Sequence, residues 1–215
     1  MPQTDMDAAM ELNAVAPIGP QLFRSLRARI IRAELGPGMR LSEQEVAASY
    51  ALSRQPVREA FIRLAEEGLV EIRPQRGTFV RKISEAEVMD SRFVREAIEA
   101  DIVRLAVQRA DAGLVAELRR LVALQAEVPD GDATNFMRLD EAFHRTLADA
   151  AGKGRAWSIL ENIKAQMDRV RYLTASEFPK KLLITQHLSI VDAVERGDAE
   201  GAEAAMRTHL RKVLD

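Results

Sequence analysis

Cysteine is absent from this 215-residue sequence, which excludes disulfide bonds and thiolate metal sites. The sequence also lacks any run of about 18 or more apolar residues, so no segment is predicted to span a membrane. The N-terminus has neither the basic start nor the apolar core of a signal peptide. Together these absences favour a cytoplasmic protein without a membrane segment.

Net positive charge is missing from the chain as a whole, which carries a formal charge of −2. That value alone gives no indication of nucleic-acid binding. The charge is unevenly distributed, however: residues 21–83 carry +5, whereas residues 1–20 carry −3 and residues 84–215 carry −4. A basic N-terminal module joined to an acidic remainder is the asymmetry expected when only one part contacts phosphates.

The rest of the composition, with 47% hydrophobic and 30% charged residues, is that of a folded protein. Residues 1–17 show neither a helical nor a strand period and are predicted to be a mobile tail. A DNA-binding domain is predicted over residues 18–82 and a helical domain over residues 84–215. The link at residues 82–84 is short, so we expect the two domains to be coupled rather than loosely tethered.

Two helices are predicted directly after the tail. Apolar residues spaced four apart predict a helix over residues 20–35, which the glycines and proline at 36–38 end. Ser42 followed by Glu45 fits a capping box, which predicts a short second helix over residues 43–50.

A third helix and a hairpin follow. Ser53 is predicted to cap a helix that ends at Gly68. Residues 69–73 and 78–81 alternate apolar and polar types on either side of a turn at 74–77, which predicts two paired strands. The apolar face of the third helix consists of Val57, Ala60, Phe61 and Leu64. Helix, helix, turn, helix and hairpin is the order of a winged helix-turn-helix.

The third helix is predicted to read DNA, because a recognition helix presents its N-terminal residues to the base edges of the major groove. Arginine can bind guanine and glutamine can bind adenine through two hydrogen bonds. Side chains at helix starts can meet phosphates, and a basic wing tip suits a backbone or minor-groove contact. The predicted DNA-contacting residues are Gln44, Ser53, Arg54, Gln55, Arg58, Arg76 and Gly77. The alternative is that Arg54 and Arg58 form a solvated helix face and pair locally with Glu59 or Glu66.

These residues resemble the N-terminal domain of GntR transcriptional regulators. The resemblance covers nearly all of residues 20–82, and one departure is Gln44, where the family often has a basic residue. The matching segments are Leu41-Ser42-Glu43, Ser53 to Ala60, Glu67-Gly68-Leu69-Val70 and Arg76-Gly77-Thr78-Phe79-Val80.

From Ser84 onward, glycines and prolines separate long helical patterns, with no convincing strand and no internal repeat. The predicted fold class is therefore mostly α, a winged helix-turn-helix followed by an antiparallel bundle of six helices. The six helices are predicted over residues 84–110, 111–127, 132–151, 153–175, 179–196 and 198–214.

The three histidines of the chain, His144, His187 and His209, all lie in the predicted C-terminal helices. Asp140 and His144 are four residues apart and project from one helical face. Three imidazoles and one carboxylate from three helices would suit Zn²⁺, Ni²⁺ or another divalent transition ion. The alternative is that each histidine is a hydrogen-bonded core residue.

The C-terminal half is similar to the FCD ligand-binding domain, the helical effector domain of the FadR subfamily of GntR proteins. The resemblance implies that Asp140, His144, His187 and His209 bind a divalent metal and that the effector is a small organic acid. Six helices rather than seven place the domain nearer the VanR-like branch. The matching segments are Arg95 to Glu99, Asp140 to Gly152, Gln186 to Asp198 and Met206 to Leu210.

Arg95 lies in one of these matching segments and is predicted to hold the carboxylate of the effector. The alternative is a salt bridge to Glu99, four residues further along the same helix. Arg169 and Arg171 are weaker candidates for the same role.

The leading hypothesis is therefore a homodimeric, effector-responsive regulator, a repressor that binds a pseudo-palindromic site in double-stranded DNA. The first rival is a metalloenzyme that uses the histidine and aspartate site. The sequence offers it no adjacent general base and no His-Glu-x-x-His motif. The second rival is a helical scaffold with an incidental metal. Neither rival accounts for residues 20–82.

Overall fold

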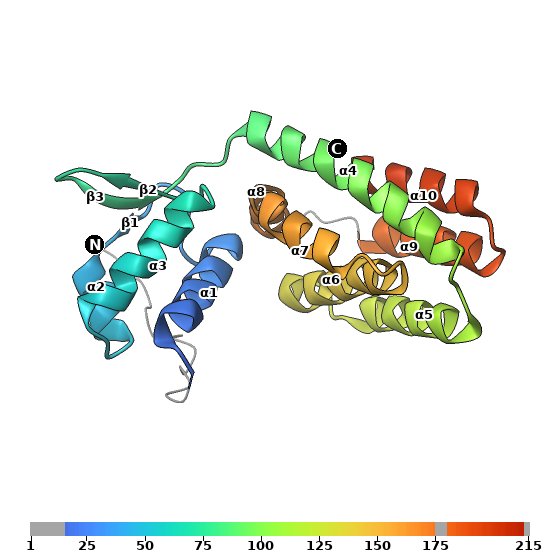
Figure 1. The fold of residues 1–215 in the computed structure, drawn as a ribbon, viewed down its shortest axis with the longest axis horizontal. Coiled ribbons are helices and arrows are strands. Elements are labelled where there is room, and N and C mark those ends of the chain that lie inside the picture. The colour runs from blue at the N-terminus through green and yellow to red at the C-terminus, as the bar shows by residue number, and fades with distance from the viewer. Residues whose placement is uncertain (1–15, 175–179, 213–215) are drawn as a thin grey trace. The chain divides into compact units, whose positions relative to one another are not determined.

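The computed structural model describes residues 16–174 and 180–212. The chain divides into two compact units whose boundary falls between Ile83 and Ser84 (Figure 1). Of the tail predicted over residues 1–17, residues 1–15 lie outside the described residues. Across the described ranges, no helix is long and apolar enough to cross a membrane.

Three helices form the body of the first unit: α1 (Ile18–Ile31), α2 (Glu43–Ser49) and α3 (Arg54–Glu66). The apolar face predicted for α1 is buried, and α1 packs against α3. Helix α1 ends at Ile31 rather than at the predicted residue 35. The reason is Ala33, whose φ of 60° is left-handed and cannot continue a helix.

The two predicted helix caps differ in the structure. The hydroxyl of Ser42 accepts a hydrogen bond of 3.4 Å from the backbone N–H of Glu45, as predicted for α2. Ser53 occupies the N-cap position of α3, but its side chain makes no capping hydrogen bond. The prediction that Ser53 caps α3 was therefore wrong, and its hydroxyl is exposed.

The predicted hairpin forms from β2 (Val70–Arg73) and β3 (Gly77–Val80). Their antiparallel register pairs Val70 with Val80 and Arg73 with Gly77. A third strand, β1 (Arg40–Leu41), pairs with the other edge of β3 and gives the sheet order β1-β3-β2. Sequence analysis missed β1 because two residues are too few to show a period.

The second unit is all helical over its described residues. Helix α4 runs beside α10, and α5 packs against α6 and α9 (Figure 1). The helices are α4 (Glu85–Val107), α5 (Ala112–Glu127), α6 (Ala133–Ala150), α7 (Gly154–Ile163), α8 (Ala165–Leu173), α9 (Lys180–Glu195) and α10 (Ala199–Lys212). Side-chain caps at Ser84, Asp111 and Asp132 begin α4, α5 and α6.

The described part of this unit thus has seven helices, and the predicted count of six was wrong. The helix predicted over 153–175 is interrupted at Lys164, which ends α7 and begins α8. No glycine or proline marks this break in the sequence. It coincides with two tertiary contacts: the Ser91 hydroxyl donates to the Ile163 carbonyl at 2.9 Å, and the Lys164 ammonium donates to the Glu141 carboxylate of α6. The helix count therefore gives no support for the VanR-like branch.

The core of the second unit is built mainly from apolar side chains of α4, α5, α6, α7, α9 and α10. Its largest buried members include Phe143 of α6 and Trp157 of α7. The Phe143 ring stacks on the His187 ring, with centroids 4.3 Å apart. The three histidines therefore lie within the packed interior rather than at the surface.

Candidate functional site

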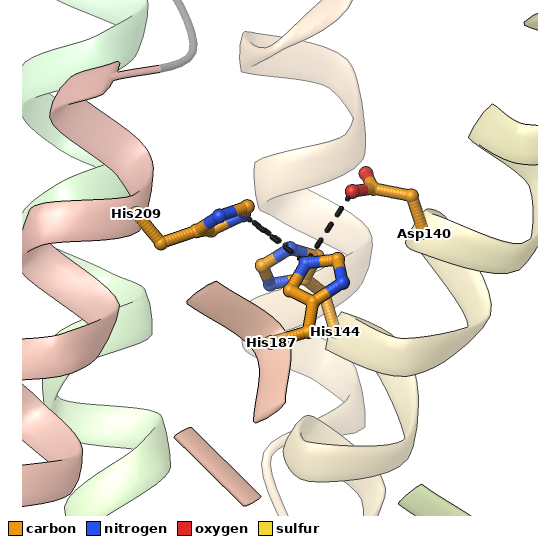
Figure 2. Close-up of side chains that lie close together, drawn as sticks. All are labelled: Asp140, His144, His187 and His209. Carbon is orange, nitrogen blue, oxygen red and sulfur yellow. Dashed lines mark hydrogen bonds and ion pairs between the residues drawn. The ribbon is translucent and has the colours of Figure 1, made fainter. Parts of the chain in front are cut away.

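Four side chains from three helices converge inside the second unit (Figure 2). Asp140 and His144 come from α6, His187 from α9 and His209 from α10. All four are buried, and their potential ligand atoms lie within 4.8 Å of one another. The structure thus brings together the full set of metal ligands that the sequence predicted.

Three of the distances between these atoms are close to those expected around a single ion. The Nε2 atom of His209 lies 3.2 Å from Nε2 of His144 and 3.3 Å from Nε2 of His187. Oδ1 of Asp140 lies 3.5 Å from Nε2 of His187. Ligand atoms about 2.1 Å from a tetrahedral or octahedral ion are roughly 3.0–3.4 Å apart, so these distances match the edges of a coordination polyhedron.

Each imidazole is oriented by a partner on its other nitrogen. In metal sites such partners fix the ring and its tautomer, so that the ligating nitrogen keeps its lone pair. Nδ1 of His144 faces Oε2 of Glu99 at 2.5 Å. Nδ1 of His187 faces Oε1 of Gln125 at 2.7 Å, and Nδ1 of His209 faces Oε1 of Gln186 at 3.2 Å. Sequence analysis assigned none of these three residues to the metal site. Glu99 was detectable only through its place in the Arg95 to Glu99 motif, and Gln125 carries no signal.

The two oxygens of Asp140 have different surroundings. Oδ2 accepts a hydrogen bond of 2.7 Å from Nη2 of Arg171, whereas Oδ1 has no hydrogen-bond partner among the described residues. Burial acts to raise the pKa of Asp140, but the charge of Arg171 outweighs it and holds that pKa well below its usual range. A buried, ionised oxygen without a partner is the atom that a bound cation would satisfy.

The imidazoles of His187 and His209 are in the form that a metal requires. Burial lowers the pKa of His187 to about 3, and burial together with the other histidines lowers the pKa of His209 well below its usual value. Both rings are therefore neutral at pH 7, and only a neutral imidazole coordinates. Burial acts to raise the pKa of Glu99, but Arg95 and His144 outweigh it and lower that pKa to about 2.

Arg95 is 1% exposed and shows the contact that the alternative interpretation expected. Its Nε donates to Oε1 of Glu99 at 2.5 Å. Its Nη1, however, has no hydrogen-bond partner among the described residues. The salt bridge thus leaves one donor of this buried guanidinium for an anion. The weaker candidates are engaged elsewhere: Arg171 with Asp140, and Arg169 with Gln166 through a hydrogen bond of 2.8 Å.

In the first unit, the side chains predicted to read DNA are exposed at the start of α3. Nη2 of Arg54 donates to Oε1 of Gln44 at 3.2 Å, and Arg58 makes two hydrogen bonds, of 3.2 and 3.1 Å, to Glu43. The alternative interpretation named Glu59 or Glu66 as local partners, so Glu43 on α2 is a partner that it missed. Exposed pairs of this kind are weak, so phosphates or bases can replace them.

The wing carries a further basic residue. Arg76 is exposed in the turn between β2 and β3, and Gly77 has a φ of 105°. Strand β1 places Arg40 so close to Gly77 that a Cβ there would lie 3.1 Å from Arg40 Nε. Sequence analysis did not include Arg40 because the strand that positions it was not predicted.

Two family patterns match the chain. The pattern described as "Bacterial regulatory proteins, gntR family" matches residues 20–80, and the FCD domain matches residues 90–212. The four clustered side chains, Asp140, His144, His187 and His209, all lie within the second match.

Other regulators are similar to this chain over nearly its whole length. The chain is 40% identical over 212 residues to the HTH-type transcriptional repressor RspR of Escherichia coli K12, covering 98% of this chain and 93% of that protein. It is 30% identical to a probable D-xylose utilization operon transcriptional repressor of Paenarthrobacter nicotinovorans, covering 97% of this chain and 92% of that protein.

Solved structures extend the likeness to the fold. Escherichia coli McbR/YncC superposes with a TM-score of 0.80 at 20% identity, covering 93% of this chain and 96% of that chain. A putative GntR transcriptional regulator from Rhodococcus sp. RHA1 superposes with a TM-score of 0.76 at 28% identity, covering 91% of this chain and 97% of that chain.

Proposed function

Because the chain belongs to the GntR family of bacterial transcriptional regulators and carries an FCD domain, we propose that it is a homodimeric repressor controlled by a small carboxylate bound near a divalent metal. The family consists of regulators rather than enzymes, so the metalloenzyme hypothesis is discarded. Because bacterial DNA lies in the cytoplasm, the proposed DNA target implies a cytoplasmic protein.

DNA binding is assigned to the first unit. Arg54, Gln55 and Arg58 lie exposed on the first turn of α3, where a recognition helix meets base edges. Gln44, Ser53 and the wing are the proposed sites of backbone contacts. Two such modules in a homodimer would read the two halves of a pseudo-palindromic operator. The repressor assignment draws on the relatives that are named as repressors.

The metal is assigned to the second unit, with Zn²⁺ or Ni²⁺ as the proposed ion. The observation that carries this proposal is the convergence of three Nε2 atoms and the partnerless Oδ1 of Asp140. When bound, the ion supplies a Lewis-acidic centre for a carboxylate oxygen. Nη1 of Arg95 is the proposed protein donor to the same effector.

Elemental analysis combined with DNA binding tests the proposal. The wild-type protein is expected to contain one divalent ion per chain and to change its affinity for a selected operator when the matching carboxylate is added. His187→Ala is expected to lose both the metal and the response. Ser189→Ala, an exposed substitution on the same helix, is the matched control and should retain both. A wild-type protein that binds no divalent ion would contradict the metal-centred part of the proposal.

A further inference from the structure

The hydrogen bond from Arg171 to Asp140 has a consequence for how Asp140 can bind an ion. A carboxylate binds a metal through one oxygen or through both, and the choice decides how many coordination positions it occupies. We infer that Arg171 is a positioning residue that restricts Asp140 to a single metal-binding oxygen, Oδ1. The inference rests on the proposed metal site and specifies how that site stays open to the effector.

The two oxygens of Asp140 are distinguished by their contacts. Oδ2 is held by Arg171 Nη2 at 2.7 Å, and both side chains are almost fully buried. Oδ1 is 3.5 Å from Nε2 of His187 and has no hydrogen-bond partner among the described residues. For Asp140 to bind through both oxygens, Oδ2 would have to exchange a charge-assisted hydrogen bond for the ion and leave the buried guanidinium without this partner.

Arg171 is itself held in place by a chain of buried charges. Its Nη1 lies 3.7 Å from Oδ1 of Asp168, and Oδ2 of Asp168 accepts a hydrogen bond of 2.8 Å from Lys164. Lys164 also contacts Glu141, the neighbour of Asp140 on α6. The chain therefore begins and ends on adjacent residues of α6 and passes through α8. Because these contacts hold the Arg171 guanidinium in place, its hydrogen bond to Oδ2 fixes the orientation of the Asp140 carboxylate.

One oxygen from Asp140 and three imidazole nitrogens make four protein ligands. Ions such as Ni²⁺ accept more than four, so positions remain for a carboxylate effector. A second oxygen from Asp140 would occupy one of them. Arg171 is thus a specificity-determining residue that acts through Asp140 and has no need to touch the effector.

The test compares wild-type protein with Arg171→Met, which removes the donor at similar side-chain length. The variant Arg171→Met/Asp168→Asn removes a positive and a negative charge together, which guards against failure to fold. Infrared difference spectra of protein labelled with ¹³C-aspartate, Co²⁺-loaded minus metal-free, report whether the carboxylate binds through one oxygen or two. Azide, titrated into the Co²⁺ protein and followed by visible absorption, probes the open positions.

Wild-type protein is expected to show the wide carboxylate splitting of one-oxygen binding and a spectral response to azide. Both Arg171 variants are expected to keep one Co²⁺ per chain, show the narrow splitting of two-oxygen binding, and bind azide about tenfold more weakly or worse. Arg171→Lys, which keeps a donor, should restore the wild-type splitting. Arg119→Met removes an arginine that pairs with Asp192 away from this site, and should change neither readout.

Unchanged splitting and azide affinity in both variants would overturn the inference and leave Arg171 as a charge-balancing residue. Loss of Co²⁺ from both variants would also overturn it, because Asp140 would then need Arg171 in order to bind at all. A wild-type protein that binds no Co²⁺ is a different result, since it would remove the proposed metal site itself.

Discussion

At the scale of single residues, both units contain arginine–carboxylate pairs, one exposed to solvent and the other buried. Arg58 pairs with Glu43 at the surface, with 60% of the arginine side chain exposed, whereas Arg171 pairs with Asp140 in the interior at 3%. Water and salt screen the attraction within the first pair, and they screen the buried pair much less. The exposed arginines are thus available to DNA, and the buried one holds the carboxylate of a proposed metal ligand.

Arg54→Ala and Arg58→Ala are each expected to weaken specific DNA binding by about 1–3 kcal/mol, because each removes a donor from the first turn of α3. Fluorescence anisotropy with a selected operator at fixed salt measures the loss. Arg24→Ala removes the same charge from an exposed position on α1 and serves as the control. Operator affinities equal to wild type in both α3 variants would contradict the assignment of the recognition helix.

Acid is expected to destabilise the metal-free protein in a defined pH window. The pKa of His187 is about 3 in the folded chain and about 6.5 when unfolded, so the unfolded chain binds more protons between these values. The free energy of unfolding is then highest above pH 6.5 and falls as the pH drops toward 3, by up to about 1.4 kcal/mol per pH unit for each such histidine.

Urea denaturation of chelator-treated protein between pH 7.5 and 4.5 measures this slope. His187→Gln should reduce it, because one depressed histidine has been removed. The carboxylates with lowered pKa values contribute mainly below about pH 4, which separates their effect from that of the histidines. Stability independent of pH between 7 and 5 would show that the histidines do not resist protonation in the folded state.

At the scale of elements, short-range patterns account for most helix starts and fail where the tertiary structure intervenes. The serine caps of α2 and α4 and the aspartate caps of α5 and α6 follow from local hydrogen bonding. The break between α7 and α8 does not follow from local hydrogen bonding, because the contact at the break comes from Ser91, about 70 residues away in the sequence. Strand β1 likewise forms only because β3 is beside it.

Ser42→Ala and Ser53→Ala form a matched pair that tests the caps. Ser42→Ala is expected to destabilise the protein by about 0.5–1 kcal/mol through loss of the bond to Glu45, whereas Ser53→Ala should leave stability nearly unchanged. Thermal or urea unfolding measures both. Equal destabilisation by the two substitutions would mean that Ser53 caps α3 after all.

At the scale of the whole molecule, the proposed function requires two binding events and two copies of the chain. A metal that binds only the native state stabilises it by mass action, so added Zn²⁺ or Ni²⁺ is expected to raise the melting temperature and a chelator to lower it. Differential scanning fluorimetry measures the shift. His209→Ala should abolish it, and a shift of wild-type size in that variant would place the metal elsewhere.

The chain is also expected to sediment as a dimer, both free and on an operator with two half-sites. A single module contacts too few base pairs to select one site over competing genomic DNA. Analytical ultracentrifugation gives the stoichiometry, and a half-site duplex is the control for one-module binding. A monomer on the complete operator would contradict the proposed mode of recognition.

The sequence by itself indicated the family, the order of the three helices and the hairpin in the first unit, and the four candidate ligands Asp140, His144, His187 and His209. These depend on local spacing, on capping residues and on side-chain chemistry, all of which can be read along the chain. The tertiary structure alone decided that the four meet within 4.8 Å and that Glu99, Gln125 and Gln186 orient the imidazoles. It alone also decided that Arg171 holds one oxygen of Asp140. Such contacts join residues tens of positions apart, and the apolar period of a helix shows which face is buried but not which residues of other helices meet it.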